Sequence, residues 1–253
     1  MHFHLPKPMH GWREFVGEVG IIVIGVLIAL GAEQLVEAAR WREQVSAGRE
    51  ALRDDYINII VNAREREGED ACIRRRLSDL TIVLNDGGGI LPPLGTIGNP
   101  PGRIWYPVSW DSLVASNVSV HMPRNEMLAH AQIAVQARMA ENTSQQELYD
   151  WAKLYSMVGK GRKLDGAESG QLRESIAVAL YRLNLLRLVA PQIEQSVLET
   201  GLLTKDDMRN AAKNLSRSKN GPNWRTICGP IQPPSGRIAE APYDPSVQLN
   251  PLQ

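Results

Sequence analysis

Residues 19–32, VGIIVIGVLIALGA, form an uninterrupted apolar run that contains no charged, amide or hydroxyl side chain. The run has 14 residues, whereas a helix needs about 20 apolar residues to cross ~30 Å of hydrocarbon. Further apolar residues extend it on both sides, from Phe15 upstream to Val36 downstream. We therefore predict a transmembrane helix over residues 15–36, preceded by a short N-terminal tail of residues 1–14.

Two tryptophans, Trp12 and Trp41, bracket this segment. Their separation corresponds to about 44 Å of helix at 1.5 Å per residue. That length is close to the thickness of a bilayer with its headgroup layers, where tryptophan rings concentrate. We predict that both are interfacial anchors. Two alternatives remain: residues 29–31 (ALG) loosely resemble the cleavage site of a secretory signal peptide, and short apolar runs also form hairpins in soluble proteins.

The orientation of the predicted helix depends on weaker signals, because lysine and arginine are nearly balanced on its two sides. A short tail, a first apolar helix and a long following domain are the usual arrangement of a signal-anchor protein. The paired cysteines also suit an oxidising compartment. We predict a single-pass protein with a cytoplasmic N-terminus and its C-terminal domain outside the cytoplasm.

Small residues line one side of the predicted membrane helix. At 100° per residue, Glu18, Gly25, Ala29 and Ala32 fall within a stripe about 60° wide. Small side chains let two membrane helices approach closely, and a carboxyl group there could hydrogen-bond a partner. The stripe therefore predicts a packing face for a partner helix or a second copy. A helix alone in lipid, with Glu18 at the interface, is the alternative.

Two stretches resemble an uncharacterised family of bacterial single-pass membrane proteins. The first is residues 18–30 (EVGIIVIGVLIAL), where a glutamate, several apolar residues and an I-G-x-L-I-A-L motif follow a short tail. The second is residues 110–139, which is similar to the helix–turn–helix of that group. The resemblance covers about a third of the chain. It implies a helical domain anchored in the bacterial inner membrane, and it implies no activity.

The remaining sequence predicts a mainly α fold in which the membrane helix continues into a helical bundle. Residues 87–107 contain eleven glycines and prolines and should form a loop, docked through Ile104, Trp105 and Tyr106. Residues 219–253 contain seven of the 16 prolines and should form an extended tail. The predicted parts between them are a long amphipathic helix or helix pair (37–86) and a helical domain (108–218). Within this domain residues 125–158 form a long helix with a broad apolar face, made of Leu128, Ala131, Val135, Met139, Leu148, Trp151, Leu154 and Tyr155.

The two cysteines are candidates for a disulfide. Cys72 lies on a predicted helix and Cys228 in the predicted tail, so a bond would fasten the tail to the bundle. The alternatives are two free thiols or a chain exposed to the reducing cytoplasm.

No motif indicates catalysis, a cofactor or a metal site. His2, His4 and His10 could bind a metal ion, but no third ligand lies at a fixed spacing from them. We predict that His121 and His130 are surface or core residues. Arginines and acids alternate over residues 64–76, which predicts a solvated, self-neutralising surface. With 28 basic and 28 acidic residues, the chain has no net charge and is not expected to bind nucleic acid.

Abundant helix faces without convergent catalytic groups favour an interaction or scaffold module. We expect it to be held in the lipid bilayer and to bind another protein or itself through the membrane helix. A ligand-binding sensor acting through a partner membrane protein is the alternative. An enzyme with a site assembled from scattered residues is the third option.

Overall fold

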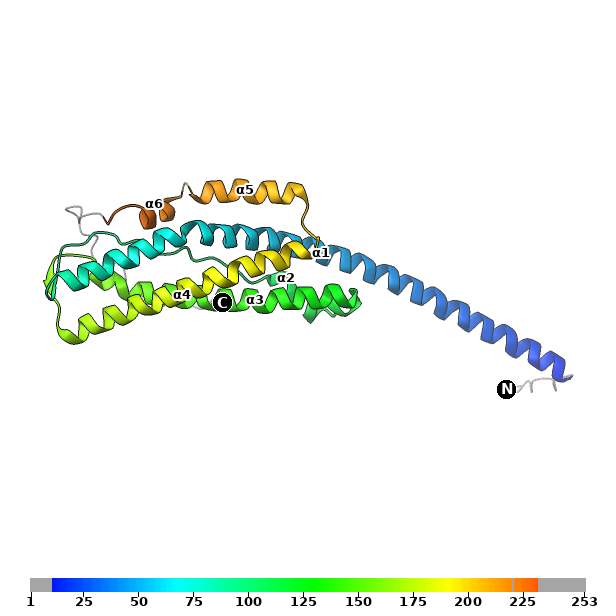
Figure 1. Ribbon diagram of the computed structural model, residues 1–253. Helices are drawn as coiled ribbons and strands as arrows, with labels where there is room; N and C mark the ends of the chain where they lie inside the picture. Colours follow the sequence, from blue (N-terminus) through cyan, green and yellow to red (C-terminus); the bar gives the residue numbers. More distant parts are fainter. Residues whose placement is uncertain (1–10, 220, 232–253) are drawn as a thin grey trace, which may run out of the picture.

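The computed structural model describes residues 11–219 and 221–231, so predictions for residues 1–10 and 232–253 lie outside the described residues. Its main element is helix α1, Trp12–Asp86, which runs unbroken for 75 residues. The predicted membrane helix and the amphipathic segment therefore belong to one helix, and residues 37–86 are not a helix pair. At 1.5 Å per residue this helix is about 110 Å long. Figure 1 shows its first part projecting as a free rod and its second part within the bundle.

Three further long helices complete the bundle. Helices α3 (Arg124–Leu154) and α4 (Gly166–Glu199) pack against each other, α4 also packs against α1, and α5 (Lys205–Lys219) lies along α1. Pro191 lies inside α4, and the helix continues past it to Glu199. The shorter elements are helix α2 (Val108–Ala115), the 3₁₀ turns η1 (Ser119–His121) and η2 (Tyr155–Met157), and helix α6 (Pro222–Cys228).

The Gly/Pro-rich segment crosses the bundle in extended form. It begins with strand β1 (Ile90–Leu91), which pairs antiparallel with β2 (Arg162–Lys163). Further along, the Ile104 carbonyl accepts a hydrogen bond from Asn62 of α1 (2.7 Å), and the Trp105 N–H donates to Glu141 of α3 (2.5 Å). The segment is thus held between α1 and α3. The predicted docking is confirmed for Trp105, which is buried, and wrong for Ile104, which is exposed.

The apolar core is divided into two clusters. One surrounds Tyr56 and Trp105 towards the projecting rod, and the other surrounds Ile73 and Trp151 at the opposite end. Charged side chains lie between the two clusters, where α1, α3, α4 and the extended segment meet. We call this group the charged layer; its members are Glu65, Arg66, Glu69, Arg103, Glu147, Asp150 and Arg182.

The predicted apolar face of α3 is confirmed for Trp151 and Leu154, which are buried in the core, and wrong for its first half. There the core side of the helix carries the small residues Ala134, Ala137 and Ala140, which allow close packing. Three large residues predicted on the face are exposed: Val135 is 72% accessible, and Leu128 and Met139 are also open to solvent. At 100° per residue these three fall within about 40° of each other. We call Leu128, Val135 and Met139 the α3 stripe.

The beginning of the predicted extended tail is helical. Helix α6 starts at Pro222, whose ring presets a helical φ and which needs no hydrogen-bond donor in a first turn. Ile227 is buried against the second core cluster, and Cys228 is bonded to α1. Gly98, with φ +70°, lets the extended segment pass α6 closely, since a Cβ there would lie 3.1 Å from the Ile227 backbone. These contacts join residues that lie far apart in the sequence. A prediction from proline content could not include them, and it therefore gave an extended chain instead of a helix.

Candidate functional site

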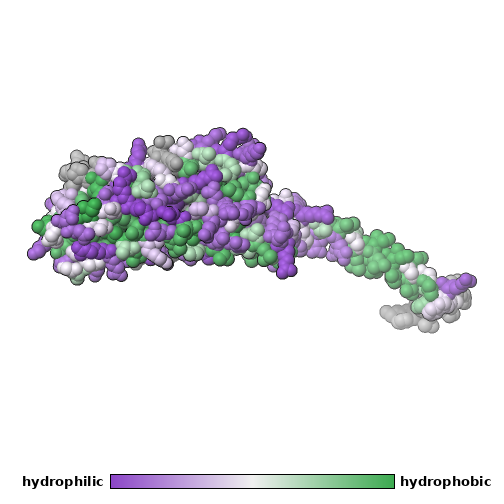
Figure 2. Space-filling view, in the orientation of Figure 1, coloured by the Kyte–Doolittle hydropathy of each residue, from purple (hydrophilic) through white to green (hydrophobic). Residues whose placement is uncertain are grey.

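The projecting part of α1 is the most unusual surface of the molecule. The side chains of residues 21–30 are all exposed, and Figure 2 shows this part as a continuous hydrophobic rod beside a largely hydrophilic bundle. The segment is long and apolar enough to span a membrane, with a mean hydropathy of 2.4 over its most apolar window and none of that window buried. Helix α4 also passes this test, but it is partly buried as a core helix of the bundle.

The predicted packing stripe and one predicted anchor lie on this rod. Glu18, Gly25, Ala29 and Ala32 are exposed, and a Cβ at Gly25 would meet no atom within 4 Å. Trp12 is exposed as well. Within a single chain the stripe therefore has no partner among the described residues, and its role stays a prediction.

The second predicted anchor, Trp41, lies where the rod enters the bundle. Its ring stacks on that of His121 from η1, with centroids 3.7 Å apart and planes 14° from parallel. Its Nε1–H donates to Glu37 (3.2 Å), and the Arg40 guanidinium lies 5.6 Å from the ring centroid. This stack therefore joins α1 to η1 at the point where the rod meets the bundle.

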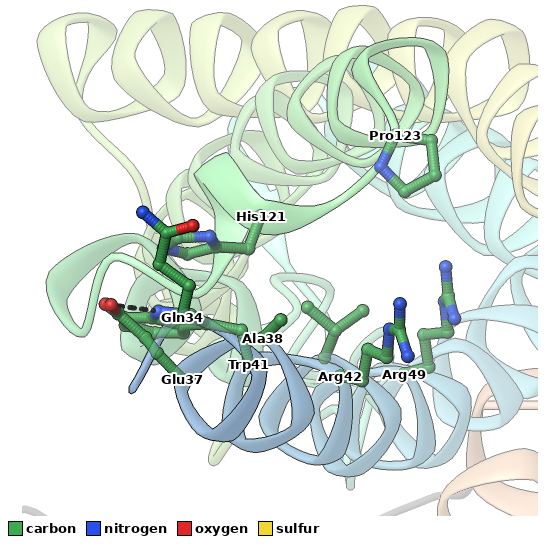
Figure 3. Close-up of a pocket in the computed structure, with 9 residues that line it drawn as sticks. Gln34, Glu37, Ala38, Trp41, Arg42, Arg49, His121 and Pro123 are labelled. Carbon is green, nitrogen blue, oxygen red and sulfur yellow. Dashed lines mark hydrogen bonds between the residues drawn. The ribbon is translucent and has the colours of Figure 1, made fainter. Parts of the chain in front are cut away.

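A pocket of about 510 Å³ opens beside this stack. We call it the junction pocket; it is lined by Gln34, Glu37, Ala38, Trp41, Arg42, Val45, Arg49, His121 and Pro123. Figure 3 shows α1 supplying one wall, while His121 and Pro123 face it from the opposite side. Arg49 is held by Glu126 of α3 through two hydrogen bonds of 2.7 Å. Arg42 is exposed and makes no hydrogen bond or ion pair with any of the described residues.

Behind the pocket, a buried polar pair stabilises the junction. The Tyr56 hydroxyl and His130 Nδ1 are 2.7 Å apart, and both residues are buried. Burial lowers the pKa of His130 and raises that of Tyr56, so both are neutral near pH 7. The Arg49 guanidinium lowers the pKa of Glu126, which stays ionised beside them. His130 is thus a core histidine.

Three ion pairs cross the charged layer. Arg66 reaches Glu147 (2.6 Å), Arg103 forms a forked pair with Glu65 (2.6 and 2.8 Å), and Arg182 reaches Asp150 (2.5 Å). Each pair joins two different elements, so together they tie α1 to α3, α1 to the extended segment and α3 to α4. Pairs of this kind favour one register of the helices over others.

The fourth carboxyl group of the layer, that of Glu69, forms no ion pair with a described residue, although Arg66 and Arg103 lie near it. Glu69 is 1% exposed, and its Oε2 has no hydrogen-bond partner among the described residues. Burial, and then the nearby charge of Glu65, raise the pKa of Glu69 from 4.5 to about 7. The pKa of Glu69 therefore lies near neutral pH.

Arg76 and a disulfide hold α6 on α1. Cys72 and Cys228 have Sγ atoms 2.10 Å apart, a bonded geometry. One turn further along α1, the buried Arg76 donates to the carbonyls of Thr226 (3.1 Å) and Gly229 (2.5 Å) at the end of α6, and to that of Ile97 in the extended segment. Burial lowers the pKa of this guanidinium, whose charge faces the negative end of a helix dipole.

Sequence reasoning missed most of these polar residues. Residues 64–76 were predicted to be a solvated surface, yet Glu65, Arg66, Glu69 and Arg76 are buried. The spacing held a signal, since Glu65, Glu69, Ile73 and Arg76 recur every three or four residues on one side of the helix. That side continues the apolar face of α1, which marks it as the buried one.

The described residues contain no group of three or more histidine, cysteine, aspartate or glutamate side chains arranged to hold a metal ion. Comparisons with protein-family models, curated proteins and solved structures find no match for this chain. The fold and the site therefore define a mainly α protein with an exposed apolar rod. The resemblance to the bacterial single-pass family stays a prediction.

Proposed function

We propose that this chain is a single-pass membrane protein whose helical bundle acts outside the cytoplasm as an interaction or scaffold module. The observation that carries the proposal is the exposed apolar rod of residues 15–36, which is continuous with the central helix of the bundle. An apolar surface of this size would favour aggregation if it were exposed to water, whereas a lipid bilayer would cover it. The bacterial inner membrane is the location that the family resemblance implies.

The placement outside the cytoplasm is supported by the bond between Cys72 and Cys228. Disulfides persist in oxidising compartments and are rarely kept in the cytoplasm. A cytoplasmic N-terminus with an external bundle follows from this placement and from a single crossing.

Two surfaces support binding to another protein. The small-residue stripe around Gly25 suits a partner helix within the bilayer. The α3 stripe places large apolar side chains in water, where a partner would cover them.

The test begins with membranes from cells that express the full chain. Resistance to alkaline extraction, together with reporter fusions at both termini, establishes anchoring and orientation. Gentle detergent extraction, sizing and co-purification then detect the partner or the second copy. Release of the intact chain by alkali, or a mature chain that begins after residue 36, would refute the anchoring.

A matched pair of variants tests the α3 stripe. V135R places a charge in the stripe, whereas Q145R places the same charge at an exposed position of α3 that lies 80° or more around the helix from the stripe. V135R should reduce co-purification about tenfold or more while Q145R leaves it near the wild-type level. Equal co-purification by both variants would exclude the α3 stripe as the contact.

A further inference from the structure

The turn that joins α2 to α3 lies beside the end of the apolar rod. It contains η1, whose His121 stacks on Trp41, and Figure 3 shows Gln34 of α1 beside the same histidine. Gln34 belongs to the last part of the proposed span, and Trp41 follows Val36 by about 8 Å along the helix. The headgroup layer on each side of the hydrocarbon is about 5–8 Å thick. If residues 15–36 span the bilayer, the turn is therefore level with this layer, a placement that rests on the proposed function.

The same turn carries no formal charge. Residues 112–123 (SLVASNVSVHMP) contain no aspartate, glutamate, lysine or arginine, although these four types make up 22% of the chain. We call this stretch the uncharged turn. Moving a charged side chain from water towards hydrocarbon is costly, so a surface without such side chains can approach lipid at little cost.

Two apolar side chains of the uncharged turn are open to their surroundings. Val120 is 66% exposed and Val114 is 48% exposed, whereas Val118 and Met122 are buried in the first core cluster. Between Val114 and η1 the backbone of Asn117 is left-handed (φ 59°), a conformation that asparagine tolerates better than most residues. Single exposed valines are common on protein surfaces. Here they coincide with an absence of charge and with a position beside the rod.

We infer that the uncharged turn is a second membrane contact, in which Val114 and Val120 enter the boundary between headgroups and hydrocarbon. Two valines bury too little area to hold a protein on lipid by themselves. The rod keeps the turn at the bilayer surface, so the contact forms within one anchored molecule and needs little affinity of its own. The bundle is then attached at the rod and at the turn, which restricts its tilt relative to the bilayer.

The test uses the purified full chain in phospholipid nanodiscs, with a spin label on one added cysteine. The two native cysteines are bonded to each other, so the added thiol is the one that reacts with the label. Oxygen concentrates in lipid, whereas a polar nickel chelate stays in water. The ratio of the collision rates with these two molecules therefore reports whether the label lies in lipid or in water.

Three labelled variants give the scale. I24C lies in the middle of the rod and marks lipid, and I82C replaces an exposed residue of α1 about 60 Å beyond Trp41 and marks water. V120C should give an oxygen-to-nickel ratio at least about threefold above that of I82C. A ratio for V120C equal to that of I82C, with I24C in lipid, would overturn the contact and leave the membrane anchor standing. Equal ratios for I24C and I82C would refute the anchor itself.

A label at A115C tests whether the valine side chain makes the contact. Ala115 is an exposed residue of the uncharged turn, so its label should also report lipid. Adding V120D should lower the A115C ratio to that of I82C, because the charge keeps the turn in water. V135D places the same charge at an exposed valine of α3 and should leave the A115C ratio unchanged. Equal ratios with V120D and V135D would show that Val120 does not hold the turn on lipid.

Discussion

Glu69 makes the stability of the bundle depend on pH. Its carboxyl group is buried without an ion pair to any residue that the structure describes, and burial raises its pKa from 4.5 to about 7. The folded state therefore prefers the protonated form. This contribution to stability is complete below pH 4.5 and is lost as the pH rises through 7. At 1.36 kcal/mol per pKa unit, the loss is about 3 kcal/mol.

E69Q should remove this dependence. A neutral amide avoids the burial of a charge, so the variant should exceed wild type in unfolding free energy by about 3 kcal/mol at pH 8 and match it near pH 4. Denaturant unfolding of the purified full chain at several pH values measures the difference. The exposed Glu67 supplies the control, since E67Q should leave the pH profile unchanged. Parallel profiles for E69Q and wild type would contradict the assignment.

Arg76 is the second residue whose burial has a measurable consequence. It satisfies carbonyl groups at the end of α6 and in the extended segment, so R76M would leave them buried without a donor. We expect R76M to lower the unfolding free energy by about 2–4 kcal/mol and to increase amide hydrogen exchange in α6. R75M changes an exposed neighbour and should cost less than about 0.5 kcal/mol. Equal effects of the two variants would show that Arg76 does not cap α6.

Among the elements, α6 depends most on a single covalent bond. The Cys72–Cys228 disulfide closes a loop with a sequence separation of 156. In the chain-entropy model such a crosslink stabilises the folded state by about 5 kcal/mol. C228S should therefore lower the unfolding free energy by up to about that amount and expose α6 to proteolysis.

C72S and the double variant C72S/C228S provide the controls for this bond. All three variants should lose the same stability, because each removes the same crosslink. A reducing agent should lower the stability of wild type to the level of C228S and leave C228S unchanged. If wild type does not respond to the reductant, the bond does not contribute to stability.

Whether a segment forms a helix or a loop could be predicted where the sequence pattern is long and depends only on neighbouring residues. The apolar run around Gly25, the glycine and proline content of residues 87–107 and the spacing in α4 each depend on neighbouring residues alone. Which face of a helix is buried depends on its partners, so the face predicted for α3 combined the buried Trp151 and Leu154 with three exposed residues, Leu128, Val135 and Met139. Large apolar residues suggested the core, but close packing selected the alanines instead.

The polar contacts of the site were not predicted, because they too depend on partners that are remote in sequence. The pairing of Arg66 with Glu147, or of Trp41 with His121, joins residues about 80 positions apart. A single sequence gives no measure of such contacts. The cysteines were the exception, because two cysteines admit one intramolecular bond.

At the scale of the whole molecule, one continuous helix joins the exposed rod to the core. No bundle element contacts residues 15–36 closely enough to bury them, since the described side chains there are exposed apart from the half-buried Gly20 and Gly31. Changes in the rod should therefore leave the bundle folded. This separation allows membrane association and folding to be measured independently.

The double variant I24K/L27K tests what the rod does. Each lysine near the centre of a membrane helix opposes insertion by about 2.5–3.5 kcal/mol, so the pair should abolish stable insertion. The altered chain should appear in the alkaline supernatant, with its α-helical circular dichroism and its core stability near those of wild type. L128K/V135K makes the same chemical change on the bundle surface and should remain in the membrane pellet. Retention of I24K/L27K in the pellet would mean that a surface other than the rod holds the protein on the membrane, because the lysines remove the apolar character on which insertion depends.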